Sequence, residues 1–161
     1  MFQFFKKKSA PKREMAAVAD GQVVPMNEAT DPVFSSCALG NGVVIHPEGE
    51  LIVAPDDGTI TATMDGSNHA IGLELQSGVE VLIHIGVDTV KLNGEGFEIF
   101  VKNGDKVKKG DQLIHFDRKA MEDKGYCMEV MQIVMDGEQT TGMNYQTGIT
   151  AKAGETIIAT W

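Results

Sequence analysis

Two histidines, His69 and His84, are the residues of this chain best suited to chemistry near neutral pH. Imidazole loses its proton in this range and can then act as a nucleophile, a hydrogen-bond donor or a metal ligand. The flanking runs 69–75 and 79–85 alternate in side-chain character, which is typical of strands, and Gln76-Ser77-Gly78 between them contains a turn signal. The pattern predicts an antiparallel hairpin that carries both histidines.

The register of this hairpin decides whether the two rings can meet. If residues 77–78 form a two-residue turn, Ile71 lies opposite His84 and His69 lies opposite Gly86. His69 and His84 are then diagonal neighbours on one face, with Cα atoms about 7–8 Å apart. A register shifted by one residue would place them on opposite faces.

The composition favours one all-β domain. The chain has 161 residues, 42% of them hydrophobic, and its 18 glycines suit many short strands joined by tight turns. A faint repeat relates 17–23 to 54–60, and turn glycines also precede β-rich stretches at 104–114 and 151–159. We therefore expect an antiparallel β-sandwich or barrel.

Helix signals are scarce, and the ends of the domain follow from composition. The best helical candidate is 118–124, which Gly125 closes, so we expect one or two short helices. Residues 1–16 contain Phe, Lys and Pro in a pattern that predicts a flexible tail, and the domain is expected to span 17–161.

Charge and cysteine usage limit the possible partners. The net charge is −9, which excludes nucleic acid as an expected ligand and suits docking to a basic protein. Cys37 and Cys127 have no zinc-type spacing, and neither a signal peptide nor a run of about 20 apolar residues is present. We expect a cytoplasmic protein that is not an integral membrane protein.

The segment 78–97, GVEVLIHIGVDTVKLNGEGF, carries a specific resemblance. It is similar to the signature of glucose-class IIA domains of bacterial sugar phosphotransferase systems, with His84 at the place of the active histidine. Asn68-His69-Ala70 resembles the region of the family's second histidine. Asp31-Pro32-Val33-Phe34 and Gly40-Asn41-Gly42 resemble the loop before its early strand. The resemblance extends over nearly all of residues 16–158.

The resemblance implies a fold, an activity and partners. The fold is a β-sandwich of the duplicated hybrid motif type. The activity is that of a phosphotransferase component: a histidine-containing phosphocarrier protein donates a phosphoryl group to His84, which passes it to a cysteine of a IIB domain for sugar uptake. The family's reacting atom corresponds to Nε2 of His84. Regulatory targets that distinguish the two phosphorylation states are also implied.

Supporting roles follow from the same resemblance. His69 is expected to donate an N–H to the phosphoryl group, and Ser67, where the family commonly has Thr, is expected to orient His69. A further set is expected to form the docking face: an apolar collar of Val33, Phe34, Met64 and Ile71, and two acidic positions, Asp31 and Asp88. Ile71 and Met64 replace aromatic residues of the family, and the chain is one residue longer beside Met64.

Two alternatives belong to other classes. A lysostaphin-type zinc peptidase has a related fold, but its His-x-His ligand pair is absent; no cofactor is expected, and His69 and His84 would hold zinc only with a partner's carboxylate. A lipoyl or biotinyl carrier module is suggested by 104–113, but its modified lysine has no counterpart. His46 and His115 match no family role and are expected to lie at the surface or in loops.

Overall fold

The computed structural model describes residues 13–137 and 140–161, and its regular secondary structure consists mainly of short strands. Two α-helices and two short 3₁₀ segments accompany the strands. The elements are β1 Glu14–Ala16, β2 Gly21–Pro25, η2 Met26–Glu28, α1 Pro32–Ser35, β3 Asn41–Pro47, β4 Leu51–Val53, β5 Gly58–Thr63, β6 Ala70–Leu75, β7 Glu80–Ile85, η3 Thr89–Leu92, β8 Phe97–Ile99, β9 Lys106–Val107, β10 Gln112–Phe116, α2 Arg118–Asp123, β11 Val130–Val134, β12 Asn144–Tyr145, β13 Ile149–Ala151 and β14 Ile157–Thr160.

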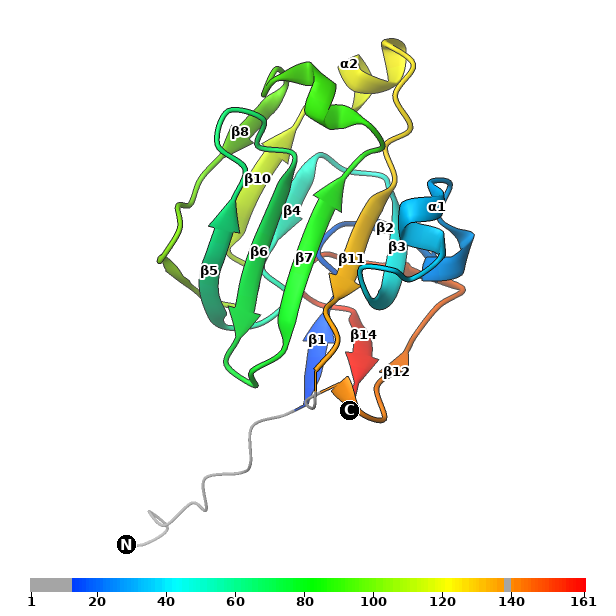
Figure 1. The fold of residues 1–161 in the computed structure, drawn as a ribbon, viewed down its shortest axis with the longest axis vertical. Coiled ribbons are helices and arrows are strands. Elements are labelled where there is room, and N and C mark those ends of the chain that lie inside the picture. Colours follow the sequence, from blue (N-terminus) through cyan, green and yellow to red (C-terminus); the bar gives the residue numbers. More distant parts are fainter. Residues whose placement is uncertain (1–12, 138–139) are drawn as a thin grey trace, which may run out of the picture.

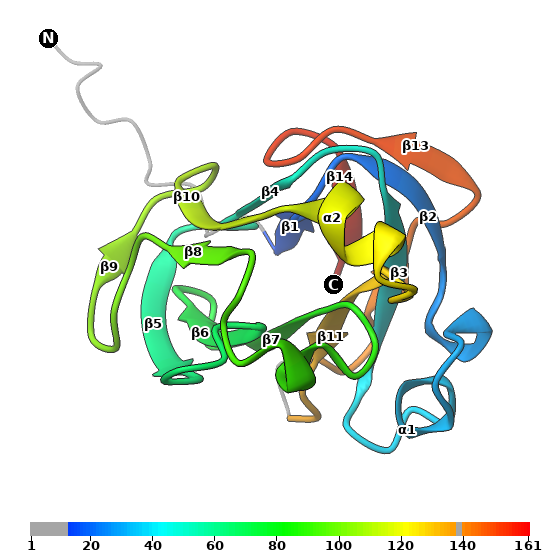
Figure 2. The same ribbon diagram turned by 90° about the horizontal axis from the view of Figure 1, so that it is seen from above.

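The strands form one large sheet and two small ones. The large sheet has the order β13-β2-β3-β11-β7-β6-β5-β9, and the small sheets are β1-β14-β12 and β4-β10-β8. All recorded pairings are antiparallel (Figure 1). Seen from above, the sheets curve around an interior that apolar side chains from all three of them fill (Figure 2). The expected all-β sandwich with two short helices is confirmed.

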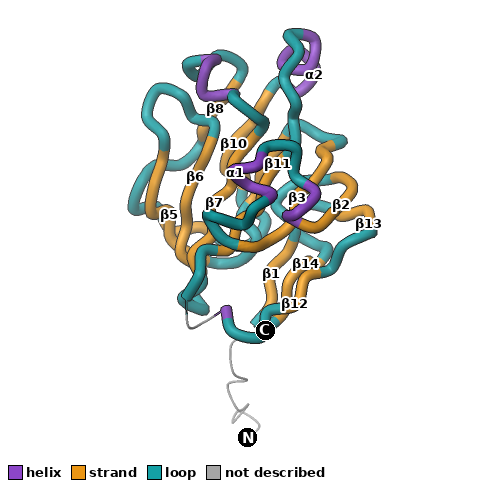
Figure 3. The backbone as a smooth tube through the Cα atoms, turned by 45° about the vertical axis from the view of Figure 1, so that its right-hand side comes forward, coloured by secondary structure: helices purple, strands orange, loops and turns teal. Residues whose placement is uncertain are grey.

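The large sheet has a second apolar layer on its outer face. Along β7, Val81, Ile83 and Ile85 are buried in the main core, so Leu82 and His84 face outward. Helix α1 lies outside β3, β11 and β7 (Figure 3). A separate buried cluster joins α1 and η2 to the outer face of the sheet: Met26, Ala29, Phe34, Val44, Met131 and Ile133.

The faint sequence repeat corresponds to a repeated loop contact. Asp20 accepts a hydrogen bond from the Ala153 backbone at 2.8 Å, and Asp57 accepts one from the Lys109 backbone at 2.9 Å. Gly154 and Gly110, which follow those donors, in turn donate to the carbonyls of Ala17 and Ala54. Each copy of the strand and Asp-Gly turn thus receives a distant glycine loop in the same way.

The expected domain boundary is wrong by a few residues. Glu14–Ala16 forms β1 and pairs with β14, and Met15 and Ala16 are buried. Gln132 fixes this segment from the central strand, because its side-chain amide donates to the Ala16 carbonyl at 2.9 Å and accepts from the Val18 N–H at 3.0 Å. The domain therefore includes residues 14–16, and residues 1–12 of the expected tail lie outside the described residues.

The histidine hairpin forms, but the expected register is wrong by one residue. Ala70, rather than Ile71, lies opposite His84, because the connection has three residues instead of two. Gly78 takes a φ of +92°, and the N–H of Leu75 donates to the Val79 carbonyl across the loop. Three-residue loops that end in a left-handed glycine are a common hairpin type.

The loop after β7 requires glycine at position 86. Gly86 has a φ of +77°, and a Cβ there would lie 2.4 Å from the Thr89 side chain and 3.1 Å from Met128 Sδ. Both the left-handed backbone conformation and the lack of room for a Cβ atom thus require glycine. This requirement fixes the path of the chain just after β7.

We predict that Gly86→Ala destabilises the protein more than a matched glycine substitution does. Gly148 has a φ of +75° but nothing within 4 Å of its Cβ position, so Gly148→Ala measures the backbone cost alone. The expected losses of unfolding free energy are about 1 kcal/mol at Gly148 and about 3 kcal/mol at Gly86. Urea denaturation of both variants measures these losses. Equal losses would show that the Thr89 and Met128 side chains move aside without destabilising the protein.

Candidate active site

His84 occupies the centre of the large sheet with a ring or strand on each side. On β7 it lies between Ala70 of β6 and Met131 of β11. The ring of Phe34 lies over it, with centroids 4.8 Å apart and planes at 52°. The ring of His69 meets it edge-on, with centroids 4.9 Å apart and planes at 81°. The two histidines therefore form one site, as the sequence predicted.

His69 reaches this face although the register is shifted. It precedes β6, and Asn68 before it has a left-handed φ of +52°. Strand alternation holds only within a regular strand, so this bend frees His69 from the face that a continued β6 would give it. The carbonyl of His69 still accepts from the Ile85 N–H at 2.8 Å, which fixes the backbone while the ring turns toward His84.

Ser67 contacts the second histidine directly. Its hydroxyl lies 2.8 Å from Nδ1 of His69 and 3.4 Å from the carbonyl oxygen of Met64. The backbone N–H groups of Ser67 and Asn68 also donate to this carbonyl. When the hydroxyl donates to Nδ1, the ring proton of neutral His69 is on Nε2, and that N–H is available for a ligand.

A glycine pair supports the loop that holds Ser67. Gly94 has a φ of +90°, and a Cβ on it would come 2.4 Å from the Gly66 carbonyl. The loop 64–68 therefore packs against the segment after η3, and this segment belongs to the motif 78–97. This contact shows why the motif needs glycine at a position remote from the histidines.

The electrostatics of the site favour a neutral His84. Burial, followed by the charge of His69, lowers its pKa to about 4. The Gly86 backbone, Asp31 and Asp88 oppose this shift and raise the pKa. Nδ1 of His84 is buried and makes no hydrogen bond of ordinary geometry, although the Gly86 carbonyl acts on the ring. A carbonyl that accepts from one ring nitrogen favours the proton on that nitrogen and leaves a free lone pair on the other.

Burial also lowers the pKa of His69. Both rings are consequently neutral near pH 7, and the site contains two imidazoles without a positive charge. A neutral imidazole can attack an electrophile with one nitrogen while its other nitrogen remains protonated.

The two acidic positions expected at the docking face both act electrostatically on His84. Asp31 caps α1 by accepting from the Val33 N–H at 2.9 Å, so part of this carboxylate serves the helix. Asp88 is exposed in a left-handed conformation at the start of η3. The negative charges of both residues raise the pKa of His84.

The expected apolar collar is correct in part. Val33 and Met64 are exposed apolar residues, whereas Phe34 is buried and contributes its ring to the His84 contact. Ile71 does not belong to the collar: it pairs with Ile83 and is fully buried in the main core. The family resemblance assigned Ile71 to the collar, whereas the register of the structure turns this side chain to the inner face of the sheet.

The sequence interpretation missed Val90. This residue is 49% exposed and lies two positions after Asp88, in η3. The sequence could have indicated it, because Val90 is an apolar residue in the short segment that follows the His84 strand. The other two histidines lie on strands: His46 is exposed on β3, and His115 on β10 is 3.8 Å from Glu50.

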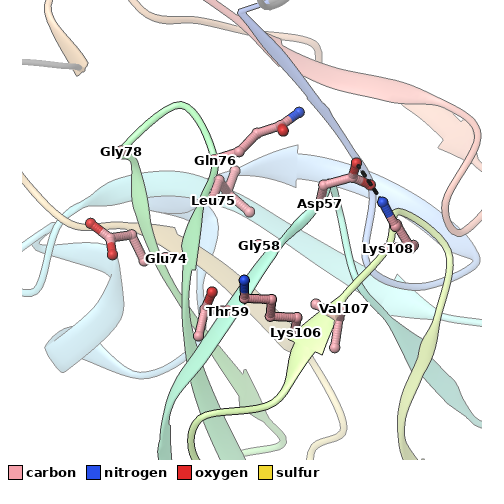
Figure 4. Close-up of a pocket in the computed structure, with 10 residues that line it drawn as sticks. All are labelled: Asp57, Gly58, Thr59, Glu74, Leu75, Gln76, Gly78, Lys106, Val107 and Lys108. Atoms are coloured by element: carbon pink, nitrogen blue, oxygen red, sulfur yellow. Dashed lines mark ion pairs between the residues drawn. The ribbon is translucent and has the colours of Figure 1, made fainter.

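A pocket lies at the other end of the hairpin. It has a volume of about 510 Å³ and lies among β5, the β6–β7 loop and β9 (Figure 4). Its polar lining includes Thr59, Glu74 and Lys106, and Asp57 and Lys108 form an ion pair at 3.9 Å. Glu74 is four residues beyond Ala70, so about 13 Å of strand separates this pocket from the histidines.

The described residues offer limited support for a metal. No group of three His, Cys, Asp or Glu residues that could hold an ion occurs within 13–137 and 140–161. His69 and His84 supply two imidazoles, and a catalytic zinc site typically has three protein ligands. Over the same residues, no helix has the length and apolar character needed to cross a membrane.

We predict that His84 titrates with a pKa of about 4 and that His69→Gln raises this value. Removing His69 removes the charge that lowers the pKa, but burial, the larger cause, remains, so the pKa stays below the ordinary 6.5. Because the folded-state pKa is depressed, the stabilising contribution of neutral His84 is complete above pH 6.5 and is lost as the pH falls toward 4.

NMR titration of the imidazole signals measures both pKa values. The variant His84→Gln is the control for stability, because its melting temperature should fall less than that of the wild type between pH 6.5 and pH 4. A wild-type His84 pKa near 6.5 would contradict the buried, neutral ring.

Comparisons with known proteins agree with this geometry. The model of the family "phosphoenolpyruvate-dependent sugar phosphotransferase system, EIIA 1" matches residues 13–140. The glucose-specific EIIA component of Bacillus anthracis is 37% identical over 144 residues, which are 89% of this chain and 87% of that protein. The solved glucose permease IIA from Mycoplasma capricolum has a TM-score of 0.83 and 29% identity, and the match covers 99% of this chain and 98% of that one.

Longer relatives contain the same region within a larger chain. The glucose-specific EIIBCA component of Corynebacterium glutamicum is 46% identical over 111 residues, which are 69% of this chain but 16% of that protein. The matched part spans 15–16% of three such multicomponent relatives. None of these matches favours the zinc-peptidase or carrier-module alternatives. The matched family, the relatives and the fold agree, and this chain belongs to the EIIA 1 family of the phosphoenolpyruvate-dependent sugar phosphotransferase system.

Proposed function

We propose that this chain is a phosphoryl carrier that accepts a phosphoryl group on Nε2 of His84 and passes it to a IIB cysteine. The observation that carries this proposal is the contact between the His84 and His69 rings, in which Nδ1 of His84 is buried. The donor we propose is the histidine-containing phosphocarrier protein. The compartment that suits this exchange is the cytoplasm.

Acceptance requires a free lone pair on Nε2. That lone pair attacks the phosphorus of the donor's phosphohistidine, a new P–N bond forms, and the donor's N–P bond breaks with its electron pair returning to the donor ring. We propose that the Gly86 carbonyl, which raises the pKa of the ring, supports the required tautomer by favouring a proton on the buried Nδ1. Donation to IIB reverses the roles: a cysteine thiolate attacks the phosphorus, and His84 leaves with the electron pair.

His69 supports the phosphorylated state by hydrogen bonding. Phosphoryl transfer depends on positioning and on donors that meet the charge of the transferred oxygens. With Ser67 donating to Nδ1, the Nε2–H of His69 can donate to a phosphoryl oxygen on the neighbouring ring. His69 is therefore expected to act in transfer onward more than in nucleophilic attack.

The surface around the two rings suits a basic partner with apolar contacts. No Lys or Arg occurs between residues 14 and 90, the span that supplies α1, β6 and β7. Exposed Val33, Met64 and Val90 provide apolar area near Asp31 and Asp88. We propose that this face docks the donor and then the IIB domain, with charge serving mainly to steer and orient.

Regulatory partners that distinguish the two phosphorylation states would bind the same face. Zinc could bind there only when a partner supplies a carboxylate.

We predict an acid-labile phosphoryl group on His84. Purified chain is incubated with phosphoenolpyruvate, enzyme I and the donor, and intact mass is followed beside His84→Ala. The wild type should gain one phosphoryl group and His84→Ala none. His69→Gln should accept the group at a rate within about tenfold of wild type but lose at least 100-fold in transfer to IIB. Normal onward transfer by His69→Gln would overturn the role of its N–H.

We predict that Asp31→Asn and Asp88→Asn weaken association with the donor. Each change should raise the KM for the donor about threefold, with little change in kcat, because rim charges act mainly on encounter. Glu74→Gln is the control: it changes the net charge equally but lies at the distant pocket. The wild-type KM should also rise with salt. Equal effects of all three variants would show that only net charge matters.

A further inference from the structure

Glu129 is a buried carboxylate with two specific donors. Only 7% of its surface is exposed, and it stands directly before β11. Oε1 accepts from the Thr30 backbone N–H at 3.0 Å, and Oε2 accepts from the Thr30 hydroxyl at 2.7 Å. No ion pair recorded among residues 13–137 and 140–161 involves Glu129.

The backbone of Glu129 contacts one side of the histidine site. Its carbonyl accepts from the Gly86 N–H at 2.8 Å, and the Cys127 carbonyl accepts from the Val87 N–H at 2.9 Å. These bonds extend the pairing of β11 with β7 past the end of both strands. They hold the turn after His84, which leads to Asp88.

The side chain of Glu129 contacts the other side of the site. Thr30 is followed by Asp31, which caps α1, and α1 carries Phe34 onto His84. With four residues, α1 is too short to be stable on its own and depends on its contacts. Glu129 thus connects the segment that covers His84 to the strand that flanks it.

Burial of a carboxylate is unfavourable, and an apolar side chain would fill this position at lower cost. What the carboxylate adds is a pair of directional bonds to one residue, which fix where α1 begins. A buried polar group whose bonds hold the cover of an active ring has the arrangement of a positioning residue.

We propose that Glu129 is a positioning residue for His84: its carboxylate holds Thr30, and thereby keeps α1 and the Phe34 ring seated on the imidazole. The kinetic part of this inference rests on the proposed phosphoryl transfer. Its structural part concerns only the contact between two rings and can be tested without any donor.

Three variants separate hydrogen bonding from packing. Glu129→Met keeps a side chain of similar length but accepts no hydrogen bond. Glu129→Gln keeps an acceptor for the Thr30 N–H, and its amide can donate to the Thr30 hydroxyl. Thr30→Val removes the hydroxyl and keeps the backbone donor. Ile114→Val, in the buried core of the β4-β10-β8 sheet, is the control for loss of stability without loss of these bonds.

The first readout is the nuclear Overhauser effect between the Phe34 and His84 ring protons, and the second is phosphoryl acceptance. We expect Glu129→Met to lose this ring contact and at least tenfold in kcat/KM, and Glu129→Gln to remain within about twofold of wild type. Thr30→Val should be intermediate, and Thr30→Val combined with Glu129→Met should be no worse than Glu129→Met alone, because both remove the same bond.

Two results would overturn the inference. One is a normal Phe34–His84 contact in Glu129→Met with a melting temperature that falls as in Ile114→Val, which would make Glu129 purely structural. The other is a Glu129→Gln variant as impaired as Glu129→Met. If wild-type protein accepts no phosphoryl group, the proposed function fails, while the ring contact still decides the role of Glu129.

Discussion

Burial of one imidazole is the constraint on which the rest of the site depends. His84 lies in the middle of an eight-stranded sheet, yet it faces away from the main core. This position makes the ring rigid, because strands flank it on both sides, and keeps it partly out of water, because Phe34 covers it. Desolvation lowers the pKa and leaves the imidazole neutral at physiological pH, as the proposed nucleophile requires. A histidine on a loop would lack both properties.

The sheet can support this arrangement because its two faces are packed differently. The inner face belongs to a continuous core, to which Ile71, Ile83 and Ile85 contribute. The outer face carries a smaller cluster beneath α1 and η2, and this cluster ends at His84. The large core supplies stability, so the outer cluster can carry exposed apolar residues such as Val33, next to Phe34 in α1.

The sequence was sufficient for the fold class, the histidine pair and the Ser67 contact, because each depends on local pattern or on a specific motif. It was insufficient for the register of the hairpin. Gln76-Ser77-Gly78 is compatible with a hairpin loop of two or of three residues. The structure has the three-residue loop, in which Gly78 adopts a left-handed conformation. The loop length gave His84 the wrong cross-strand partner, Ile71 in place of Ala70, whereas the bend at Asn68 still brings the two rings together.

Contacts between segments that are distant in the chain could not be predicted from the sequence either. Glu129 and Thr30 are separated by 99 positions, and neither belongs to the motif around His84. Nothing in the local pattern near Glu129 distinguishes a buried acceptor from a solvated carboxylate, since only the folded arrangement supplies its two donors. Similarly, the need for glycine at position 94 arises from the Gly66 carbonyl, which another loop brings into contact.

The charge around the site bears on the direction of transfer. A phosphoryl group adds about −1.5 to −2 charges at neutral pH. It would do so here beside Asp31 and Asp88, in a span without Lys or Arg, where like charges raise the energy of the phosphorylated state. Hydrogen bonds from neutral groups such as His69 can hold such a group without neutralising it. A basic partner would lower this energy while docked, and after it leaves, the repulsion would favour release of the group to the next acceptor. The same acidic surroundings can therefore attract the donor and prevent the chain from retaining what it receives.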